Sequence, residues 1–331
     1  IIFTNKKNTI ENGLKVSVDL SNDNKIKSLH FKKSQIQPSS IDLSLSEECY
    51  QLQTSFLSPD NTVRDKLKKI YSKKISLKHP KIFKKNKTYI VRLNEKLNLS
   101  DSISGHCNPK SSTGRLNIFC RTILDYCDEY EKIPKNYNGE IFLEITTRSF
   151  DIKISKGDKL NQMRLRKKPN SYLNDEDLKK INKRTPIIFT NKKNTIENGL
   201  KVSVDLSNDN KICAYVAKKT SLNINFGKIG IYEIKKFWKP LKPINNSLII
   251  EKNKFYILKS REKIRIPKDL AGEMIPYDTG IGDFRAHYAG FFDPGFGDPK
   301  GSYAVLEVKT NELPFILEDG QTIARIKYEK L

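Results

Sequence analysis

The residues best suited to chemistry form the polar turn Asn108–Arg115, which reads NPKSSTGR. The guanidinium of Arg115 can donate to phosphate oxygens in a planar fork, while the hydroxyls of Ser111 and Ser112 fill the remaining acceptor positions. Gly114 lets a ligand approach the backbone closely. A solvent-exposed polar turn has the same composition, so both interpretations of these residues stay open.

Two further polar residues are expected to join this turn in one site. Asp42 lies in an apolar strand, and Gln162 lies on a late strand within Gly157–Arg164. Together with the turn they could hold a triphosphate bound to Mg²⁺. The magnesium ion would be bound mainly by phosphate oxygens and water, with no direct protein ligand, and would lie near Asp42.

We do not expect zinc. The four histidines, His30, His79, His106 and His287, form no HxxxH or HxE pattern. The HxE…PCxxC signature of zinc-dependent nucleobase deaminases is also absent.

A second candidate site follows near the C-terminus. The Gly-rich aromatic hairpin 286–297 precedes Glu307, which lies in an apolar strand. Such a hairpin could hold a flat base against backbone groups, with Glu307 facing the base. His287 is a candidate contact to the base, although a single histidine on a strand is more often structural.

Composition limits the class of protein. The 331 residues predict about two domains, and 61 Lys and Arg against 38 Asp and Glu make a net charge of +23. The lysines are scattered, so we expect a solvated surface and no nucleic acid partner. There is no apolar run long enough for a membrane span and no signal peptide. Five cysteines without a CxxC pair predict free thiols and a cytoplasmic protein.

Residues 1–26 recur identically as 187–212, a shift of 186 residues. Such identity indicates either a recent segmental copy or an artefact of how the sequence was assembled. We treat 1–26 as an appendage with no vacant place in the fold, and expect its deletion to leave activity unchanged.

A diverged repeat divides the rest of the chain. Three anchors recur at a shift of 163: the SIDLS string around Asp42 with SVDLS around Asp205, Glu144 with Glu307, and Gly157 with Gly320. A fourth anchor, Tyr89–Val91 with Tyr256–Leu258, recurs at a shift of 167. The chain is therefore expected to contain two copies of one fold.

Each copy is expected to be a distorted β-barrel or jelly roll with few short helices, because short alternating segments are separated by Gly and Pro turns. The expected helices are Val63–Ser72 and Asn174–Asn182. The expected division is an appendage at 1–26, a first copy at 27–166, a linker with a short helix at 167–198, and a second copy at 199–331. The clearest expected strands are Lys87–Leu93, Glu140–Thr146, Phe150–Ile154, Phe255–Lys259, Ala304–Lys309 and Ile323–Tyr328.

These segments resemble the deoxyuridine triphosphatase superfamily, most closely the two-copy dCTP deaminases. The resemblance covers about residue 34 to the end. It is carried by four motifs, which are Gln37–Leu43, Pro109–Arg115, Asp293–Phe296 with Leu306-Glu307, and Gly157–Gln162. It implies a jelly-roll fold, homo-oligomers, and active sites shared between neighbouring folds.

The resemblance also implies roles for single residues. Glu307 is the general base that takes a proton from the water attacking C4 of cytosine, and an apolar strand can raise its pKa toward the operating pH. Glu144, the counterpart of Glu307 in the first copy, is expected to be a structural remnant. The implied substrate-binding residues are Ser111, Ser112, Arg115, Gln162, His287, Ala289 and Asp293. The base-side loop 288–292 is more apolar than in the family, and Gly297–Ser302 is an insertion.

Three functions remain as alternatives. The first is deamination of dCTP to dUTP and ammonia. The second is dUTP pyrophosphatase activity, alone or in a bifunctional enzyme with Asp293 orienting water. It is ranked second because the printed sequence ends without a Gly-rich arm carrying an Arg. The third is a non-enzymatic nucleic-acid-binding protein that uses the net charge of +23.

Overall fold

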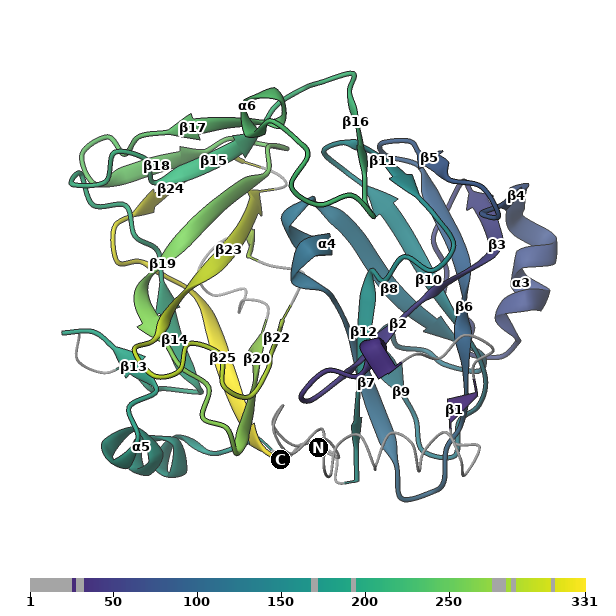
Figure 1. The fold of residues 1–331 in the computed structure, drawn as a ribbon, viewed down its shortest axis with the longest axis horizontal. Helices are drawn as coiled ribbons and strands as arrows, with labels where there is room; N and C mark the ends of the chain where they lie inside the picture. Colours follow the sequence, from purple (N-terminus) through teal and green to yellow (C-terminus); the bar gives the residue numbers. More distant parts are fainter. Residues whose placement is uncertain are drawn as a thin grey trace. The chain divides into compact units, whose positions relative to one another are not determined.

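The computed structural model describes residues 26–27, 33–167, 172–191, 195–275, 284–286, 290–310 and 313–331. The chain separates into two compact units (Figure 1). Unit 1 contains the chain up to Asn170 and the segment Thr220–Tyr232, and unit 2 contains Ser171–Lys219 and Glu233–Leu331. Strands dominate both units and helices are few and short, which confirms the predicted mostly-β fold.

Unit 1 is built on three sheets. Their strand orders are β4-β3-β6-β10-β8 with β1 beside β6, β16-β11-β5, and β2-β12-β7-β9. A 3-10 turn at Lys33–Gln35 and the helices α3 (Val63–Ile70) and α4 (Ser111–Arg115) complete the unit. The strands are β1 (Ile26–Lys27), β2 (Ile41–Leu43), β3 (Leu45–Leu52), β4 (Tyr71–Ser76), β5 (Lys81–Phe83), β6 (Thr88–Asn98), β7 (Ser104–Pro109), β8 (Ile118–Leu124), β9 (Lys132–Ile133), β10 (Asn138–Thr147), β11 (Asp151–Ile154), β12 (Asn161–Arg166) and β16 (Asn223–Asn225).

Unit 2 repeats the strand orders of unit 1. They are β17-β15-β19-β23-β21 with β13 beside β19, β14-β25-β20-β22, and β18-β24. Its helices are α5 (Asp175–Arg184) and α6 (Ile234–Phe237). Its strands are β13 (Ile188–Phe189), β14 (Leu200–Ser203), β15 (Ala214–Ala217), β17 (Trp238–Leu241), β18 (Ser247–Ile250), β19 (Tyr256–Ile264), β20 (Leu270–Ile275), β21 (Phe284–Ala286), β22 (Phe291–Phe292), β23 (Ser302–Thr310), β24 (Phe315–Glu318) and β25 (Thr322–Lys330).

Cross-strand partners recur at matching positions in the two units. Glu144 on β10 lies opposite Ile90 on β6, and Glu307 on β23 lies opposite Ile257 on β19. The predicted correspondence of Glu144 with Glu307 therefore holds in the strand register, as does the correspondence of the segments around Ile90 and Ile257.

The predicted correspondence of Asp42 with Asp205 is wrong by four residues. Asp42 lies opposite Gln162 on β12, whereas the strand position opposite Arg325 on β25 is taken by Lys201. Arg325 is the counterpart of Gln162 at the shift of 163, so Lys201 is the counterpart of Asp42. The match between the SIDLS string and the SVDLS string around Asp205 does not hold in the structure, because β14 ends before Asp205.

The predicted helices are confirmed with small changes at their ends. Thr62 is the N-cap of α3, because its side chain accepts a hydrogen bond from the Asp65 N–H, and Asn174 caps α5 in the same way. The apolar face of α3 packs on the sheet of unit 1. This cluster contains Tyr50, Leu52, Val63, Leu67, Ile90, Ile123 and Phe142.

The stretch 167–198, which we expected to be a linker, contains α5 and β13 of unit 2. Leu178 of α5 and Ile188 of β13 are buried in the core of that unit. Of the appendage at 1–26, residues 1–25 lie outside the described residues.

Candidate functional site

The predicted phosphate turn is a single turn of helix, α4, that is anchored on one side and exposed on the other. The Thr113 hydroxyl donates to the Leu160 carbonyl at 2.8 Å, and the Lys110 N–H donates to the same oxygen at 2.9 Å. Ser111, Ser112 and Arg115 are exposed, while Thr113 and Gly114 are buried. Because Ser111 and Arg115 are four positions apart, they share one face of this turn.

Asp42 and Gln162 lie side by side on neighbouring strands, as predicted for one site. Gln162 is opposite Asp42 on one side and opposite Asn108 on the other. The Ser40 hydroxyl donates to the Gln162 side-chain oxygen at 3.3 Å. Asn108 is the last-but-one residue of β7, so the strand that ends in α4 also borders Gln162.

Lys110 connects α4 to this pair of strands. Its ammonium group forms an ion pair with Oδ2 of Asp42, to which the Gln37 amide also donates at 3.3 Å. Asp42 is only 3% exposed, and its other oxygen, Oδ1, is buried and accepts no hydrogen bond from any described residue. A buried carboxylate oxygen without a donor is costly, so this atom is suited to a ligand or to water.

The surroundings of Asp42 fit a hydrated magnesium ion better than a bare one. One carboxylate oxygen faces an amine and the other has no donor among the described residues, so a water molecule of the ion could donate to Oδ1. In the described parts of the chain, no three His, Cys, Asp or Glu residues are grouped as ligands of a metal ion.

A buried carboxyl group supports the strand that carries Gln162. Asn161 accepts a hydrogen bond from the Gln162 N–H at 2.7 Å, and its amide donates to Glu131 at 3.3 Å and to Thr122 at 2.9 Å. Thr122 also donates to Glu131 through its N–H and its hydroxyl, at 3.2 and 2.9 Å. Burial nevertheless raises the pKa of Glu131 to about 7.

Glu144 is held in a closed cluster in unit 1. The Arg121 guanidinium donates to its Oε1 at 2.7 and 3.1 Å, and the Ser55 hydroxyl donates to its Oε2. Arg121 lies 3.7 Å from the centre of the Tyr130 ring, and the Tyr130 and Ser55 hydroxyls are 2.9 Å apart. These contacts occupy both oxygens of the carboxylate.

Glu307 is 2% exposed and lies on β23 in unit 2. Earlier in the same unit, Asp293 opens a turn in which its carbonyl accepts the Phe296 N–H at 3.1 Å. Gly297 follows with a φ of 70°, and a Cβ there would lie 2.3 Å from the Ile264 carbonyl oxygen. Only glycine fits this position, so the backbone conformation of the turn that follows Asp293 is fixed.

The structure brings Asp42, Gln162 and the α4 residues together in unit 1 and places Glu307 and Asp293 in unit 2. His287, Ala289 and the segment 276–282 lie outside the described residues. Sequence reasoning gave no role to Lys110 or to Arg121. A lysine directly before the Ser-Ser pair was a usable signal for Lys110, whereas the contact of Arg121 depends on the β8–β10 register.

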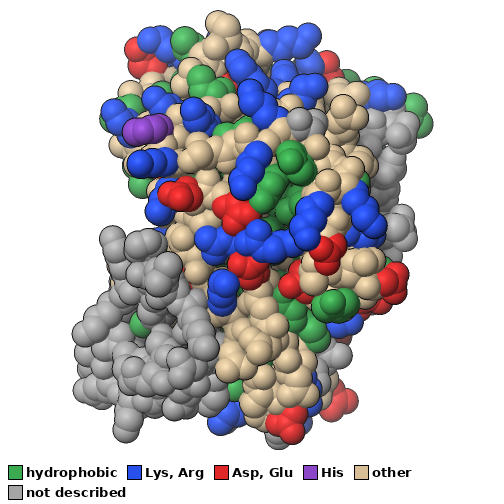
Figure 2. All heavy atoms as spheres, turned by 90° about the vertical axis from the view of Figure 1, so that its right-hand side faces the viewer, with side chains coloured by type: hydrophobic (Ala, Val, Ile, Leu, Met, Phe, Trp, Pro, Cys, Tyr) green, Lys and Arg blue, Asp and Glu red, His purple; other side chains and the backbone are tan. Residues whose placement is uncertain are grey.

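Figure 2 shows one face of the molecule, on which Lys and Arg side chains are numerous and some Asp and Glu side chains lie among them. Ion pairs such as Arg64 with Glu48 and Lys84 with Asp151 are examples from unit 1. The five cysteines are free and buried. The described helices include none that is long and apolar enough to cross a membrane.

Comparisons with known proteins agree with this geometry. The model of the 2'-deoxycytidine 5'-triphosphate deaminase N-terminal domain matches residues 14–169, and that of the C-terminal domain matches residues 174–331. The crystal structure of 2'-deoxycytidine 5'-triphosphate deaminase from Agrobacterium tumefaciens is 37% identical, with a TM-score of 0.90, and the match covers 96% of this chain and 97% of that one. A search of curated protein sequences found no match. With both domain models and a solved relative matching along nearly its whole length, the chain belongs to the 2'-deoxycytidine 5'-triphosphate deaminase family.

Proposed function

We infer that this chain deaminates dCTP to dUTP and ammonia, as a hydrolase that uses a glutamate and no zinc. The observation that carries the inference is the pairing of an exposed Ser111–Arg115 face with the buried pair Asp42 and Gln162, in a chain of this family. That arrangement suits a triphosphate, while Glu307 on a separate strand suits the base.

Glu307 acts as the general base in this proposal. It takes a proton from a water molecule as the water oxygen bonds to C4 of the cytosine ring. This proton passes to N3 of the ring. The proton of the new C4 hydroxyl group then passes through Glu307 to the amino group, which leaves as ammonia when the C4–N bond breaks and the C4 carbonyl of uracil forms. A positioned carboxylate of this kind contributes about 10²–10⁴-fold to the rate.

The phosphate side belongs to unit 1. Arg115, Ser111 and Ser112 donate to the phosphate oxygens and to the attacking water, and Gln162 adds an amide donor. Magnesium on the triphosphate would neutralise part of its charge, and Asp42 would help to hold the ion through its bound water. The counterparts of Asp42 and Gln162 in unit 2 are Lys201 and Arg325, so the two units are not equivalent on this side.

Incubation of the purified protein with dCTP and Mg²⁺, followed by chromatography of nucleotides and an ammonia assay, tests the inference. We expect dUTP and ammonia, unaffected by a zinc-selective chelator. Glu307→Gln should lower kcat by about 10²–10⁴-fold. Glu144→Gln is the matched control, and we expect it to change kcat by much less. Loss of activity in Glu144→Gln with an active Glu307→Gln would reverse the assigned roles.

The same assay separates the alternatives. Appearance of dUMP and pyrophosphate from dCTP would indicate a bifunctional enzyme, in which Asp293 orients the second water. Cleavage of dUTP with dCTP untouched would indicate a dUTP pyrophosphatase. Salt-sensitive binding of oligonucleotides without any turnover would support the nucleic-acid alternative.

A homo-oligomer and a cytoplasmic location remain part of the proposal. The free, buried state of all five cysteines supports a reducing compartment. The mass of the native protein in solution, measured by light scattering, tests the oligomer.

A further inference from the structure

A strand from the second half of the sequence belongs to unit 1. Residues Thr220–Tyr232 group with unit 1, although their neighbours along the chain, Lys219 and Glu233, belong to unit 2. The strand β16 within this segment, Asn223–Asn225, pairs in parallel with β11, and Figure 1 shows the two side by side. We call residues 220–232 the strap.

Backbone pairing and one buried side chain attach the strap to β11. Ile224 lies opposite Ile152 and is 6% exposed. The Phe226 N–H donates to the Lys153 carbonyl at 3.0 Å. On its other side β11 pairs with the short strand β5, so the strap turns a two-stranded sheet into a three-stranded one. Because two short strands have little stability by themselves, the third strand should make β11 more rigid.

The strap also runs along the turn that follows β11. A Cβ at Gly227 would lie 3.4 Å from the Asp158 carboxylate. That carboxylate accepts the Ser155 N–H at 2.8 Å, and the Asp158 carbonyl accepts the Leu45 N–H at 3.0 Å. The strap therefore lies against a turn that is also bonded to the start of β3.

The same turn leads directly into the phosphate side of the site. Leu160 follows two positions after the turn, and its carbonyl accepts hydrogen bonds from Lys110 and Thr113. Gln162 lies two positions further on, on β12. A displacement of the turn would therefore move both α4 and Gln162.

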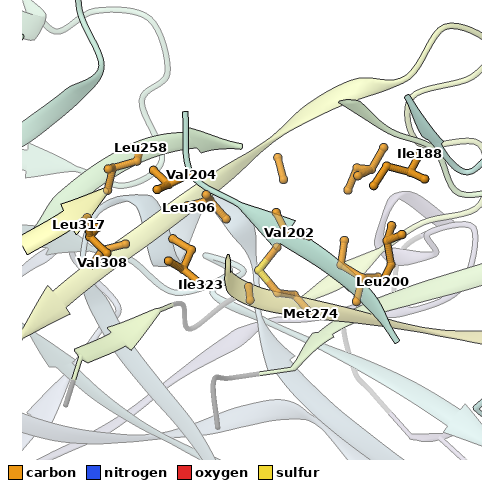
Figure 3. Packing of buried hydrophobic residues seen from close by; sticks show 14 of the residues in the cluster. Ile188, Leu200, Val202, Val204, Leu258, Met274, Leu306, Val308, Leu317 and Ile323 are labelled. Carbon is orange, nitrogen blue, oxygen red and sulfur yellow. The ribbon is translucent and has the colours of Figure 1, made fainter. Parts of the chain in front are cut away.

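Unit 2 has no third strand at the matching place within the part of it that the structure describes. In unit 1, Ile152 of β11 lies opposite Phe83 of β5. The shifts of 163 and 167 relate these residues to Phe315 and Ile250, which lie opposite each other on β24 and β18. Leu317 of β24 lies in the core of unit 2 (Figure 3), but among the described residues β24 pairs with β18 alone.

A proline explains why the two units differ here. Pro314 stands at the position of Asp151, which lies opposite Asn223 of the strap. Proline has no N–H to donate to an added strand, so this edge of unit 2 is poorly suited to one. The strap thus serves the unit that carries Gln162, whose counterpart in unit 2 is Arg325.

We propose that the strap positions the phosphate side of the site in unit 1. It holds β11 and the following turn, and through them α4 and Gln162, in the arrangement that binds the triphosphate. The strap acts through these residues and needs no contact with the substrate. The inference rests on the proposed function for the identity of the ligand.

Phe226→Pro tests the strap, because it removes the N–H that donates to Lys153 and adds no charge. Phe226→Ala is the matched control, since it truncates the same side chain and keeps the N–H. We expect KM for dCTP to rise about 3- to 10-fold in Phe226→Pro with kcat nearly unchanged, because phosphate groups that do not react bind equally in the ground state and the transition state. Unfolding of a fraction of the molecules would instead lower the apparent kcat at an unchanged KM.

Hydrogen exchange gives a readout that does not depend on turnover. We expect peptides that cover β11 to β12 to exchange faster in Phe226→Pro than in Phe226→Ala, while peptides of β6 and β10 keep their protection. Ile224→Asp and Leu222→Asp are a second pair. Ile224 is 6% and Leu222 46% exposed, so only Ile224→Asp should reproduce the effects of Phe226→Pro.

Equal exchange of the β11–β12 peptides in Phe226→Pro and Phe226→Ala would overturn the proposal. Faster exchange without weaker binding of dCTP would overturn it as well, because the strap would then hold the turn without positioning the site. If the wild type does not turn over dCTP, the proposed function fails separately. The dissociation constant of dCTP with Mg²⁺, measured by calorimetry, then replaces KM, and the exchange data still decide whether the strap holds the turn.

Discussion

Replacing Glu131 by Gln should stabilise unit 1 strongly at pH 8 and only slightly at pH 5. Burial raises the pKa of Glu131 from 4.5 to about 7, although hydrogen bonds from Thr122 and Asn161 act in the opposite direction. A carboxyl group with a higher pKa in the folded state holds its proton more tightly there. Its contribution to stability is therefore lost as the pH rises from about 4.5 through 7.

The size of the effect follows from the two pKa values. The difference between the two pKa values corresponds to about 3 kcal/mol. About 1 kcal/mol of this is already lost at pH 5, where the carboxyl group is largely ionised in the unfolded chain. Between pH 5 and pH 8 the wild type should therefore lose about 2 kcal/mol that the neutral Gln variant retains.

Hydrogen exchange of peptides from β7 and β8 is the suitable assay, because the two units need not unfold together. The Cys107 N–H, which donates to the Glu131 carbonyl, lies in this region. Glu129→Gln is the matched control, because its side chain is 59% exposed and pairs only with nearby Lys132. An equal gain in protection at both pH values, or a gain in the control, would refute the reasoning.

Three other substitutions test the positioning of the site and of the sheets. Arg64→Met should lower the urea midpoint of unit 1 by an amount worth about 1 kcal/mol, because Glu48 and Glu140 lose one ion-pair partner but keep Arg92 and Lys96. Lys68→Met on the same helix should change the midpoint little. Gly297→Ala should disrupt the turn before β23 and lower kcat for dCTP, because a Cβ there would clash with the backbone. Gly295→Ala is the control. It has open space around its Cβ and should lower the stability measured in a thermal melt by only about 1 kcal/mol. Thr113→Val should raise KM for dCTP about 10-fold in steady-state assays, because α4 loses the hydrogen bond from the Thr113 hydroxyl to the Leu160 carbonyl. An unchanged KM would show that this bond does not position the turn.

Local signals predicted most of the elements. Alternation of apolar and polar residues marked the long strands β6, β10, β19, β23 and β25, and the two longer helices, α3 and α5, were also expected from the local sequence. These signals depend on neighbours within a few residues, so they can be recognised without knowledge of the fold. The motifs around Ser111 and Glu307 were also readable, because the chemistry of a phosphate turn and of an apolar strand with one carboxylate is local.

The strand register was not predictable in the same way. The SVDLS string around Asp205 matches the string around Asp42, but in unit 2 Lys201 is the residue that takes the position of Asp42. An alternating pattern fits a sheet equally well after a shift of two or four residues. Which shift occurs is shown by a buried contact, because the Ser203 N–H donates to Glu262 as the Ser44 N–H donates to Glu95.

The sequence by itself determined the class of fold, the repetition of that fold and the residue types available for phosphate and base chemistry. Only the tertiary structure decided which of them meet. Arg121 reaches Glu144 because β8 and β10 are neighbours, and Ser55 joins them from 89 residues away. Lys110 pairs with Asp42 across 68 residues. Such contacts depend on strand order and burial, which are properties of the whole chain.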